Sequence, residues 1–301
     1  MNDTLMVIGE ALIDFIPTEQ GMALKDVCSF TKHCGGAPIN IAAATAKLGA
    51  HSKVLTQVGA DAFGDFILET LSLCQVDITA VKRTKQYPTA LAFVALDEKG
   101  NRDFTFYRDP CADLYLSAED ITATMFQDCG ILHFCSVDLV DSPMKQAHLK
   151  AIQLAKEQGA IISFDPNVRL PLWSSKEDCK NTILEFAPYA DILKISDDEL
   201  FFLTGQKDCE QVFTVFPDAT IILLTCGEQG SYLMTKEHRL YEKSIPVKAI
   251  DTTGAGDAFA AAFLYQLLRD GISREQLPHL SKDILQVYLR FSNAYAADST
   301  T

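Results

Sequence analysis

Short apolar runs alternate with amphipathic segments along most of the chain. The apolar runs have no polar face, which is typical of parallel strands buried on both sides, and the segments between them repeat apolar positions at helical spacing. The expected strands are 5–8, 53–58, 130–134, 160–164, 191–195 and 219–225, and the expected helices are 41–48, 66–74, 143–158, 176–186, 198–203, 210–216 and 258–268. This order predicts an α/β fold in which helices cover both faces of a parallel sheet.

Two stretches depart from this alternation. Residues 15–30 have no helical face, and residues 90–96 and 103–108 show aromatic alternation on either side of a turn that contains glycine. Alternation about a short turn indicates a β-hairpin. We therefore expect a small β-lid from about 15–32 and 88–109, within a single domain that spans 1–301.

Composition limits the class of protein and its partners. With 301 residues and 48% hydrophobic content, the chain can bury one large core plus a smaller attachment. Its 40 acidic and 26 basic residues give a net charge of −14, which argues against a nucleic acid or an anionic membrane as the main partner. The nine cysteines form no C-x-x-C pair, which indicates reduced thiols and a cytoplasmic location. Asp3 and Glu10 argue against a secretory signal, and no apolar run is long enough to span a bilayer.

The most informative stretch is Asp251-Thr252-Thr253-Gly254-Ala255-Gly256-Asp257, which runs into an apolar helix. Two glycines before a helix free backbone N–H groups to point at one spot, and the helix dipole adds positive potential there. A carboxylate beside a bound anion would repel it unless the carboxylate orients a hydroxyl or holds a cation. A tight turn capped by Thr252 or Thr253, with Asp257 complementing the dipole, explains the same residues. The residues alone leave both interpretations open.

Further polar residues follow the ends of other expected strands. Asp14 comes soon after the first strand, and polar clusters follow later strands at 165–169, 194–199 and 225–230. Because parallel strands end at one edge of a sheet, these clusters predict a concave polar cleft there. Asn40 heads a small-residue helix after Gly35 and Gly36, where it either caps that helix or reaches a ligand.

Several common motifs are absent from the sequence. It contains no G-x-x-x-x-G-K-[ST], no G-x-S-x-G and no H-E-x-x-H, and Phe259 stands where a dinucleotide fingerprint needs its third glycine. The six histidines lack ligand spacing, so a catalytic zinc is not expected.

Two well-separated motifs resemble those of the ribokinase-like (PfkB) carbohydrate kinases, and the resemblance extends from end to end. They are Gly35-Gly36-Ala37-Pro38-x-Asn40 and the 251–257 signature. Segments 106–108, 165–169 and 194–199 most resemble the bacterial fructokinase branch. The resemblance implies a three-layer α/β/α sandwich with a β-sheet lid, which transfers the γ-phosphoryl of MgATP to a sugar hydroxyl.

The resemblance also implies roles for individual residues. Asp257 would be the catalytic base, with the amides of the helix start as the anion hole. The expected catalytic set is Gly254, Ala255, Gly256 and Asp257. The expected sugar-binding set is Asp14, Gly35, Gly36, Asn40, Phe106, Arg108 and Arg169. The expected ATP-binding set is Lys194, Glu199, Thr225, Gly227, Gly230 and Asn293. Glu199 would hold Mg²⁺ through water, and Asp251 and Thr253 resemble ligands of a monovalent cation, K⁺ in many members.

Some alternatives stay open at this point. Arg108 is expected either as a clamp in the lid or as a solvated arginine on an edge strand. Fructose is the first choice of substrate, with 2-keto-3-deoxygluconate kinase and aminoimidazole riboside kinase as alternatives and a sugar-binding regulator outside the enzyme class. A homodimer is also allowed. Ser196 replaces the usual Asn of the Asn-x-x-Glu pattern, and relatives continue past Thr301 through a Lys-Gly-Ala stretch, so the cation site is expected to be less complete.

Overall fold

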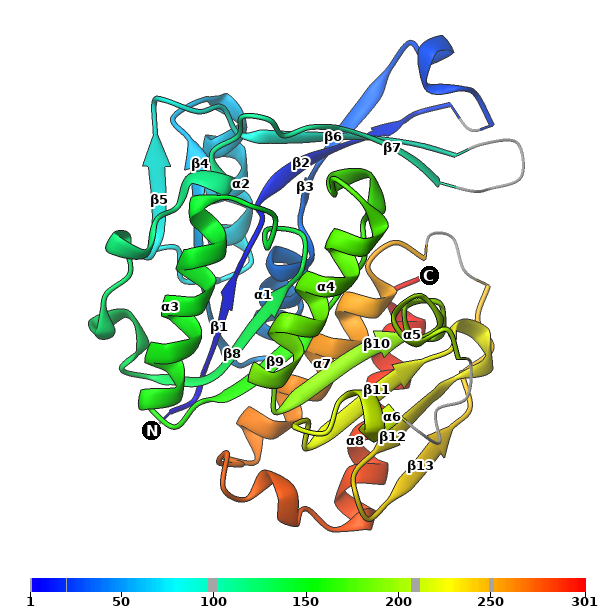
Figure 1. Cartoon of the computed structure of the whole chain (residues 1–301). Coiled ribbons are helices and arrows are strands. Elements are labelled where there is room, and N and C mark those ends of the chain that lie inside the picture. Colours follow the sequence, from blue (N-terminus) through cyan, green and yellow to red (C-terminus); the bar gives the residue numbers. More distant parts are fainter. Residues whose placement is uncertain (1, 20, 97–101, 207–211, 249–251) are drawn as a thin grey trace.

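The computed structural model describes residues 2–19, 21–96, 102–206, 212–248 and 252–301, and a nine-stranded sheet lies at its centre (Figure 1). The strand order is β13 (Arg239–Glu242), β12 (Ser231–Met234), β11 (Ile221–Thr225), β10 (Ile192–Ser196), β9 (Ile161–Asp165), β8 (Cys129–Cys135), β1 (Thr4–Ile8), β4 (His51–Gly59) and β5 (Val81–Thr84). At one edge β12 pairs antiparallel with both β11 and β13, and the remaining neighbours pair parallel. Carboxyl ends of the parallel strands therefore meet at one edge of the sheet.

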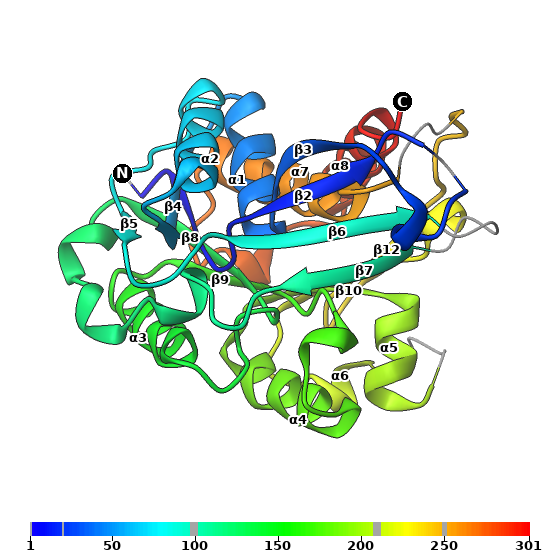
Figure 2. The ribbon, with the colours of Figure 1, turned by 90° about the horizontal axis from the view of Figure 1, so that it is seen from above.

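Helices cover both faces of this sheet, as Figure 2 shows from above. One face carries α1 (Ala37–Lys47), α2 (Ala62–Leu73), α7 (Ala255–Arg269) and α8 (Lys282–Asp298), and the other carries α3 (Pro143–Glu157), α4 (Lys176–Phe186), α5 (Asp197–Thr204) and α6 (Val212–Val215). Side chains alternate along β1, so Leu5 and Val7 join one core while Met6 and Ile8 join the other. One core lies on each side of the sheet, between the sheet and a layer of helices. The structure therefore has the three layers, helices, sheet and helices, that the resemblance implied.

A second, four-stranded sheet has the order β3 (Phe30–Gly35), β2 (Leu12–Pro17), β6 (Ala90–Leu96) and β7 (Arg102–Tyr107). The predicted hairpin is thus confirmed, as is its pairing with the earlier stretch, because β6 pairs parallel with β2. Phe15 and Phe93 stack across that pair with ring centroids 4.9 Å apart. In Figures 1 and 2 this small sheet extends over the main sheet from the end of β1.

Asp61 ties the base of the small sheet to the body. Its Oδ1 accepts from the Gly64 N–H at 2.8 Å as the N-cap of α2, and its Oδ2 accepts from the Thr89 N–H, just before β6, at 2.8 Å. One carboxylate therefore fixes both a helix start and the first residue of the hairpin.

All the expected strands and helices are present, with shifted ends. The first helix starts at Ala37 rather than 41 because Pro38 fits its first turn, and the expected helix 210–216 lies partly outside the described residues. Sequence reasoning missed β5, β12, β13 and α8. The signal for α8 was present, because Ser281 caps it and Leu285, Tyr288 and Leu289 form its buried face. None of the described helices is long and apolar enough to cross a membrane.

Candidate active site

A polar cavity of about 230 Å³ lies between the small sheet and the carboxyl edge of the large one. Leu12 and Asp14 reach it from one face of β2, and Phe106 reaches it from β7. Its lining residues are Glu10, Leu12, Asp14, Gly36, Ala37, Asn40, Phe106, Val137, Asn167, Arg169, Leu172, Lys194, Thr252, Thr253, Gly254, Gly256 and Asp257. The predicted cleft is thus present, and it brings together both sequence motifs.

The start of α7 forms one wall of this cavity. Its N-cap is Gly254, which has φ +76°, a conformation that favours glycine, and which has no side chain to cap the first-turn amides. The interpretation as a turn capped by Thr252 or Thr253 is therefore wrong. Gly256 has a second role, because a Cβ there would lie 3.0 Å from Lys194 Nζ. Gly254 and Gly256 line the cavity and let a cation approach the helix start, whereas Ala255 does not line it and its N–H donates to the Thr252 carbonyl at 3.3 Å.

Asp257 lies in the first turn of α7 and is half-buried. Asn40 Nδ2 donates to its Oδ2 at 2.9 Å, and Asn40 does not cap its own helix, so the interpretation of Asn40 as a local cap is wrong. Loss of hydration raises the pKa of Asp257, while the Asn40 hydrogen bond and the charges of Lys194 and Arg169 oppose the rise. A carboxylate with a raised pKa that keeps a hydrogen-bond donor is suited to accept a proton from a hydroxyl.

Lys194 places a buried positive charge beside the helix start. Its Nζ pairs with Asp165 Oδ2 at 2.8 Å. Burial lowers the pKa of Lys194, but Asp165 and Glu199 outweigh burial and raise it, so the ammonium stays protonated. Burial also raises the pKa of Asp165 to about 6 despite its pairing with Lys194, and Asp165 is ionised at neutral pH. The ion pair therefore holds a fixed cation near the anion hole.

Asp14 and Arg169, both of the expected sugar-binding set, also line the cavity. Burial raises the pKa of Asp14 to about 6, Arg169 lowers it and Asp257 raises it, so Asp14 is an ionised acceptor at neutral pH. A Cβ at Gly35 would overlap Asp14 Oδ2. Gly35 itself does not line the cavity, so its contribution is the space it leaves for that carboxylate.

The residues of the expected ATP-binding set lie further along the carboxyl edge of the large sheet. Ser196 ends β10 opposite Thr225 at the end of β11, and Gly227 and Gly230 turn the chain toward β12 with positive φ. Asn293 is buried on α8, where its amide accepts from Ser231 Oγ at 3.0 Å and donates to the Glu242 carbonyl at 3.1 Å. Of the expected ATP-binding set, only Lys194 also lines the cavity.

Glu199 and Ser196 form a capping box at the start of α5. Glu199 Oε2 accepts from the Ser196 N–H and Oε1 accepts from the Val168 N–H, both at 2.8 Å. The carboxylate thereby joins the loops after β9 and β10, and the serine found in place of asparagine fulfils the capping role.

Arg108 is in neither of the two expected positions. Only 5% of its surface is exposed, it does not line the cavity, and its Nη2 donates to Asp113 Oδ2 at 2.6 Å and to Asp138 Oδ1 at 2.5 Å. The expectation of a solvated edge arginine is wrong, and two buried carboxylates balance the Arg108 charge away from the cavity. The expected strand ran to Arg108, one residue past the end of β7 at Tyr107, and so placed Arg108 on the edge strand.

Seven residues that line the cavity were not in the expected site sets. They are Glu10, Leu12, Ala37, Val137, Asn167, Leu172 and Thr252. Glu10 lies two residues past the end of the first buried strand, where ligand groups gather in open α/β sheets, and that position was the available signal.

Metal ligands are not preassembled in the described part of the chain, which contains no group of three or more His, Cys, Asp or Glu residues placed to hold an ion. Thr253 lines the cavity, whereas Asp251 lies outside the described residues. Oxygen donors near a phosphate site nevertheless suit a hard cation, which keeps water and phosphate among its ligands.

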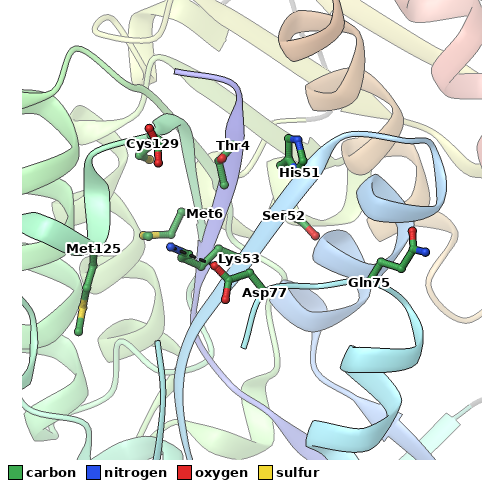
Figure 3. Close-up of a pocket in the computed structure, with 10 residues that line it drawn as sticks. Thr4, Met6, His51, Ser52, Lys53, Gln75, Asp77, Met125 and Cys129 are labelled. Carbon is green, nitrogen blue, oxygen red and sulfur yellow. Dashed lines mark ion pairs between the residues drawn. The ribbon is translucent and has the colours of Figure 1, made fainter. Parts of the chain in front are cut away.

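A second cavity, of about 160 Å³, lies at the opposite, amino-terminal edge of the sheet (Figure 3). Thr4 of β1, Ser52 of β4 and Cys129 of β8 line it, and its Lys53 pairs with Asp77 at 3.1 Å. The length of the strands separates this cavity from the active-site cleft.

Together the fold and the cleft define a class: an α/β protein in which a glycine-led helix start and a hydrogen-bonded carboxylate line one polar cavity. Comparisons with known proteins agree. The profile of the pfkB family carbohydrate kinases matches residues 2–300. Probable fructokinase-2 of Arabidopsis thaliana is 40% identical over 296 residues, which cover 97% of this chain and 88% of that protein.

Solved structures are similar over the same length. Fructokinase with bound ATP from Xylella fastidiosa has a TM-score of 0.92 at 31% identity, covering 100% of this chain and 93% of its own. Fructokinase from Vibrio cholerae O395 with fructose, ADP and calcium has a TM-score of 0.87 at 33% identity, covering 100% and 94%, and a double mutant with fructose, ADP and potassium has 0.86 at 32%, covering 99% and 92%. The chain belongs to the pfkB family of carbohydrate kinases, which makes it a phosphotransferase that acts on a sugar hydroxyl.

The role of the hydrogen bond from Asn40 to Asp257 can be tested in the pH profile of kcat/KM. Since Asn40 donates to the carboxylate form, Asn40→Ala raises the pKa of Asp257, and the ionised base is then present only at higher pH. We expect kcat/KM to fall roughly tenfold or more at pH 6 and to recover partly at pH 8, with the acid limb displaced upward. Asn181→Ala, on the exposed side of α4, is the control. An equal loss at both pH values would contradict this role for Asn40.

Proposed function

We propose that the protein is an ATP-dependent fructokinase. The proposal depends mainly on one observation: three features line the same cavity. They are the start of α7, which follows a glycine and has no side-chain cap, Asp257 with its hydrogen bond from Asn40, and the buried Lys194. The fructokinases that share its fold over their whole length, two of them with fructose or ATP named as ligands, support the choice of substrates.

In the proposed reaction, Asp257 accepts the proton of a fructose hydroxyl as the hydroxyl oxygen attacks the γ-phosphorus of ATP. The bond from that phosphorus to the β–γ bridging oxygen breaks, and ADP leaves with the electron pair. Negative charge spreads over the transferring phosphoryl oxygens, where the amides at the start of α7 and the Lys194 ammonium stabilise it. Most of the catalysis is thus positioning and fixed charge.

We assign Mg²⁺ and K⁺ to this site as cofactors of the proposed reaction. Mg²⁺ supplies charge neutralisation on the ATP phosphates when it is bound. Glu199 fits a role through water, because its oxygens already accept backbone N–H groups and keep lone pairs for further donors. Thr253 and Asp251 are proposed at the K⁺ site, with support from the potassium form of the Vibrio protein.

Charge in the cavity favours a neutral ketose over an acidic sugar. Asp14 and Asp257 line it along with Arg169 and Lys194, and Lys194 is already paired with Asp165. Arg108, the residue that would have favoured 2-keto-3-deoxygluconate, is neutralised by its own carboxylates. Asp14 and Arg169 can instead accept from and donate to fructose hydroxyls. An intact base and anion hole likewise favour an enzyme over a sugar-binding regulator, and its use of ATP supports a cytoplasmic location.

The direct test is an ADP-release screen over fructose, ribose, 2-keto-3-deoxygluconate and nucleosides, with and without potassium. We expect fructose to give the highest kcat/KM, by about tenfold or more, because a sugar lacking a matched hydroxyl leaves a buried charged group unpaired. Asp257→Asn should lower kcat by about 10² or more with little change in the Kd for ATP.

Asp283→Asn is the matched control, because Asp283 is an exposed acid in the first turn of α8, as Asp257 is in α7. Turnover of Asp257→Asn within a few-fold of wild type would refute the assignment of Asp257 as the catalytic base. Preferred turnover of 2-keto-3-deoxygluconate would contradict the choice of fructose.

We also propose that the small sheet is a lid that closes over the sugar. Its strands supply Leu12, Asp14 and Phe106 to the cavity, so bound sugar contacts both the lid and the body. Hydrogen exchange should therefore slow in β6 and β7 on saturation with fructose, while α8 serves as the unaffected reference. Exchange in β6 and β7 that is indifferent to fructose would count against a lid.

A further inference from the structure

Glu10 is a buried carboxyl group that the proposed reaction does not use. It lies two residues past the end of β1, only 3% of its surface is exposed, and it lines the active-site cavity. Its Oε1 accepts from the Ala37 N–H, at the start of α1, at 2.9 Å. The neighbouring Gly36 has φ +112°, and a Cβ there would overlap the Glu10 carbonyl oxygen. The chain is therefore shaped to bring the start of α1 against Glu10.

The other oxygen of Glu10 lacks a donor. Among the described residues, neither Glu10 Oε2 nor Asp138 Oδ2 has a hydrogen-bond partner, and both atoms are buried. Asp138 lies in the loop between β8 and α3, where its other oxygen accepts from Arg108. Buried carboxylate oxygens without donors are costly, and a carboxyl group in such a place takes up a proton instead.

The balance of charges in this buried group also favours a proton on Glu10. Arg108 is the one cation within this buried group, and it bonds to both Asp113 and Asp138. With Glu10 also ionised, three buried carboxylates would share a single guanidinium. One proton on Glu10 removes a negative charge and supplies the donor that Asp138 Oδ2 lacks.

We propose that Glu10 is a positioning residue that works as a neutral carboxylic acid, holding the start of α1 through Oε1 and donating its proton toward Asp138. The inference rests on the proposed function and adds to it a residue outside the expected site. Ala37 begins the helix that carries Asn40, and Asn40 holds Asp257, so Glu10 acts on the base through α1. It also joins the sugar cavity to the residues at the base of the lid hairpin.

Electrostatics support the neutral form at neutral pH. Burial first, and then Asp138, raise the pKa of Glu10 to about 8, while Arg108 and the Ala37 hydrogen bond lower it. Burial likewise raises the pKa of Asp138. The charged and titratable groups that face Glu10 are Asp138, Arg108, Asp113 and Cys135 from the packed elements, and Asp14, Asp257, Lys194 and Arg169 across the cavity. Burial also raises the pKa of the Cys135 thiol, which therefore stays protonated through pH 8.

The arrangement around Glu10 is stable at low pH and is lost at high pH. Below about pH 8 Glu10 is neutral, and the arrangement is intact. As pH rises through that value, Glu10 becomes a carboxylate that repels Asp138 and adds negative charge to the cavity. We expect kcat/KM for fructose to fall above pH 8, approaching about tenfold per pH unit for loss of a single proton.

The kinetic test uses Glu10→Gln, because an amide can accept from Ala37 and donate toward Asp138 at any pH. We expect its kcat/KM at pH 7 to stay within about threefold of wild type and its alkaline decline to vanish, whereas Glu10→Ala loses about tenfold or more at pH 7. Glu177→Gln, which removes an exposed carboxylate from α4, should keep the wild-type profile. A Glu10→Gln protein that is unfolded, is as impaired as Glu10→Ala, or keeps the alkaline decline would overturn the proposal.

A second measurement needs no substrate. Carbon-13 NMR of protein labelled at the glutamate carboxyl carbon should show one resonance that is protonated at pH 7, titrates near pH 8 and is missing from Glu10→Gln. An ionised Glu10 at pH 7 would overturn the inference even in an active fructokinase. Failure to phosphorylate fructose would instead refute the proposed function and leave this titration unchanged.

Discussion

The hydrogen bond from Asn40 to Asp257 is the contact on which the active site depends. It joins residues 217 positions apart in the chain, at the starts of two helices that lie side by side on one face of the sheet. Each helix follows a glycine with positive φ, so each backbone turns sharply just before its helix begins at the wall of the cavity. The contact thus sets the position of the base relative to the anion hole, and it does so only while both helix starts hold their places.

Burial then decides the chemistry of the charged groups around that contact. Burial raises the pKa values of Asp14, Asp165 and Asp257, and cations or hydrogen-bond donors offset part of each rise. Around Glu10 and Asp138 a single guanidinium serves three carboxyl groups, and protonation balances the charge there. The same desolvation therefore makes Asp257 a suitable base and makes Glu10 a neutral anchor.

Local sequence patterns predicted the parts of the site whose geometry is local. Glycines at 254 and 256 before an apolar helix indicated the anion hole, and alternation around one turn indicated the small sheet. The position of Arg108 and the protonation of Glu10 were harder to predict from the sequence. Both depend on partners such as Asp113 and Asp138, which only the folded chain brings near. No pattern of apolar positions reports which carboxyl groups share a cation. Helix α8 is different, since its cap and apolar face were visible in the sequence.

The central claim is that the start of α7 holds the transferring phosphoryl group while Asp257 faces the attacking hydroxyl. A crystal structure of the protein with fructose, Mg²⁺, ADP and a planar metal fluoride that mimics the transferring phosphoryl tests it most directly. The account predicts the fluoride within hydrogen-bonding distance of the amides of Gly254, Ala255 and Gly256, with one fructose hydroxyl between it and Asp257 and the ADP oxygen in line behind it. A planar group bound away from those amides, or a fructose hydroxyl in line with the fluoride but out of reach of Asp257, would contradict the account.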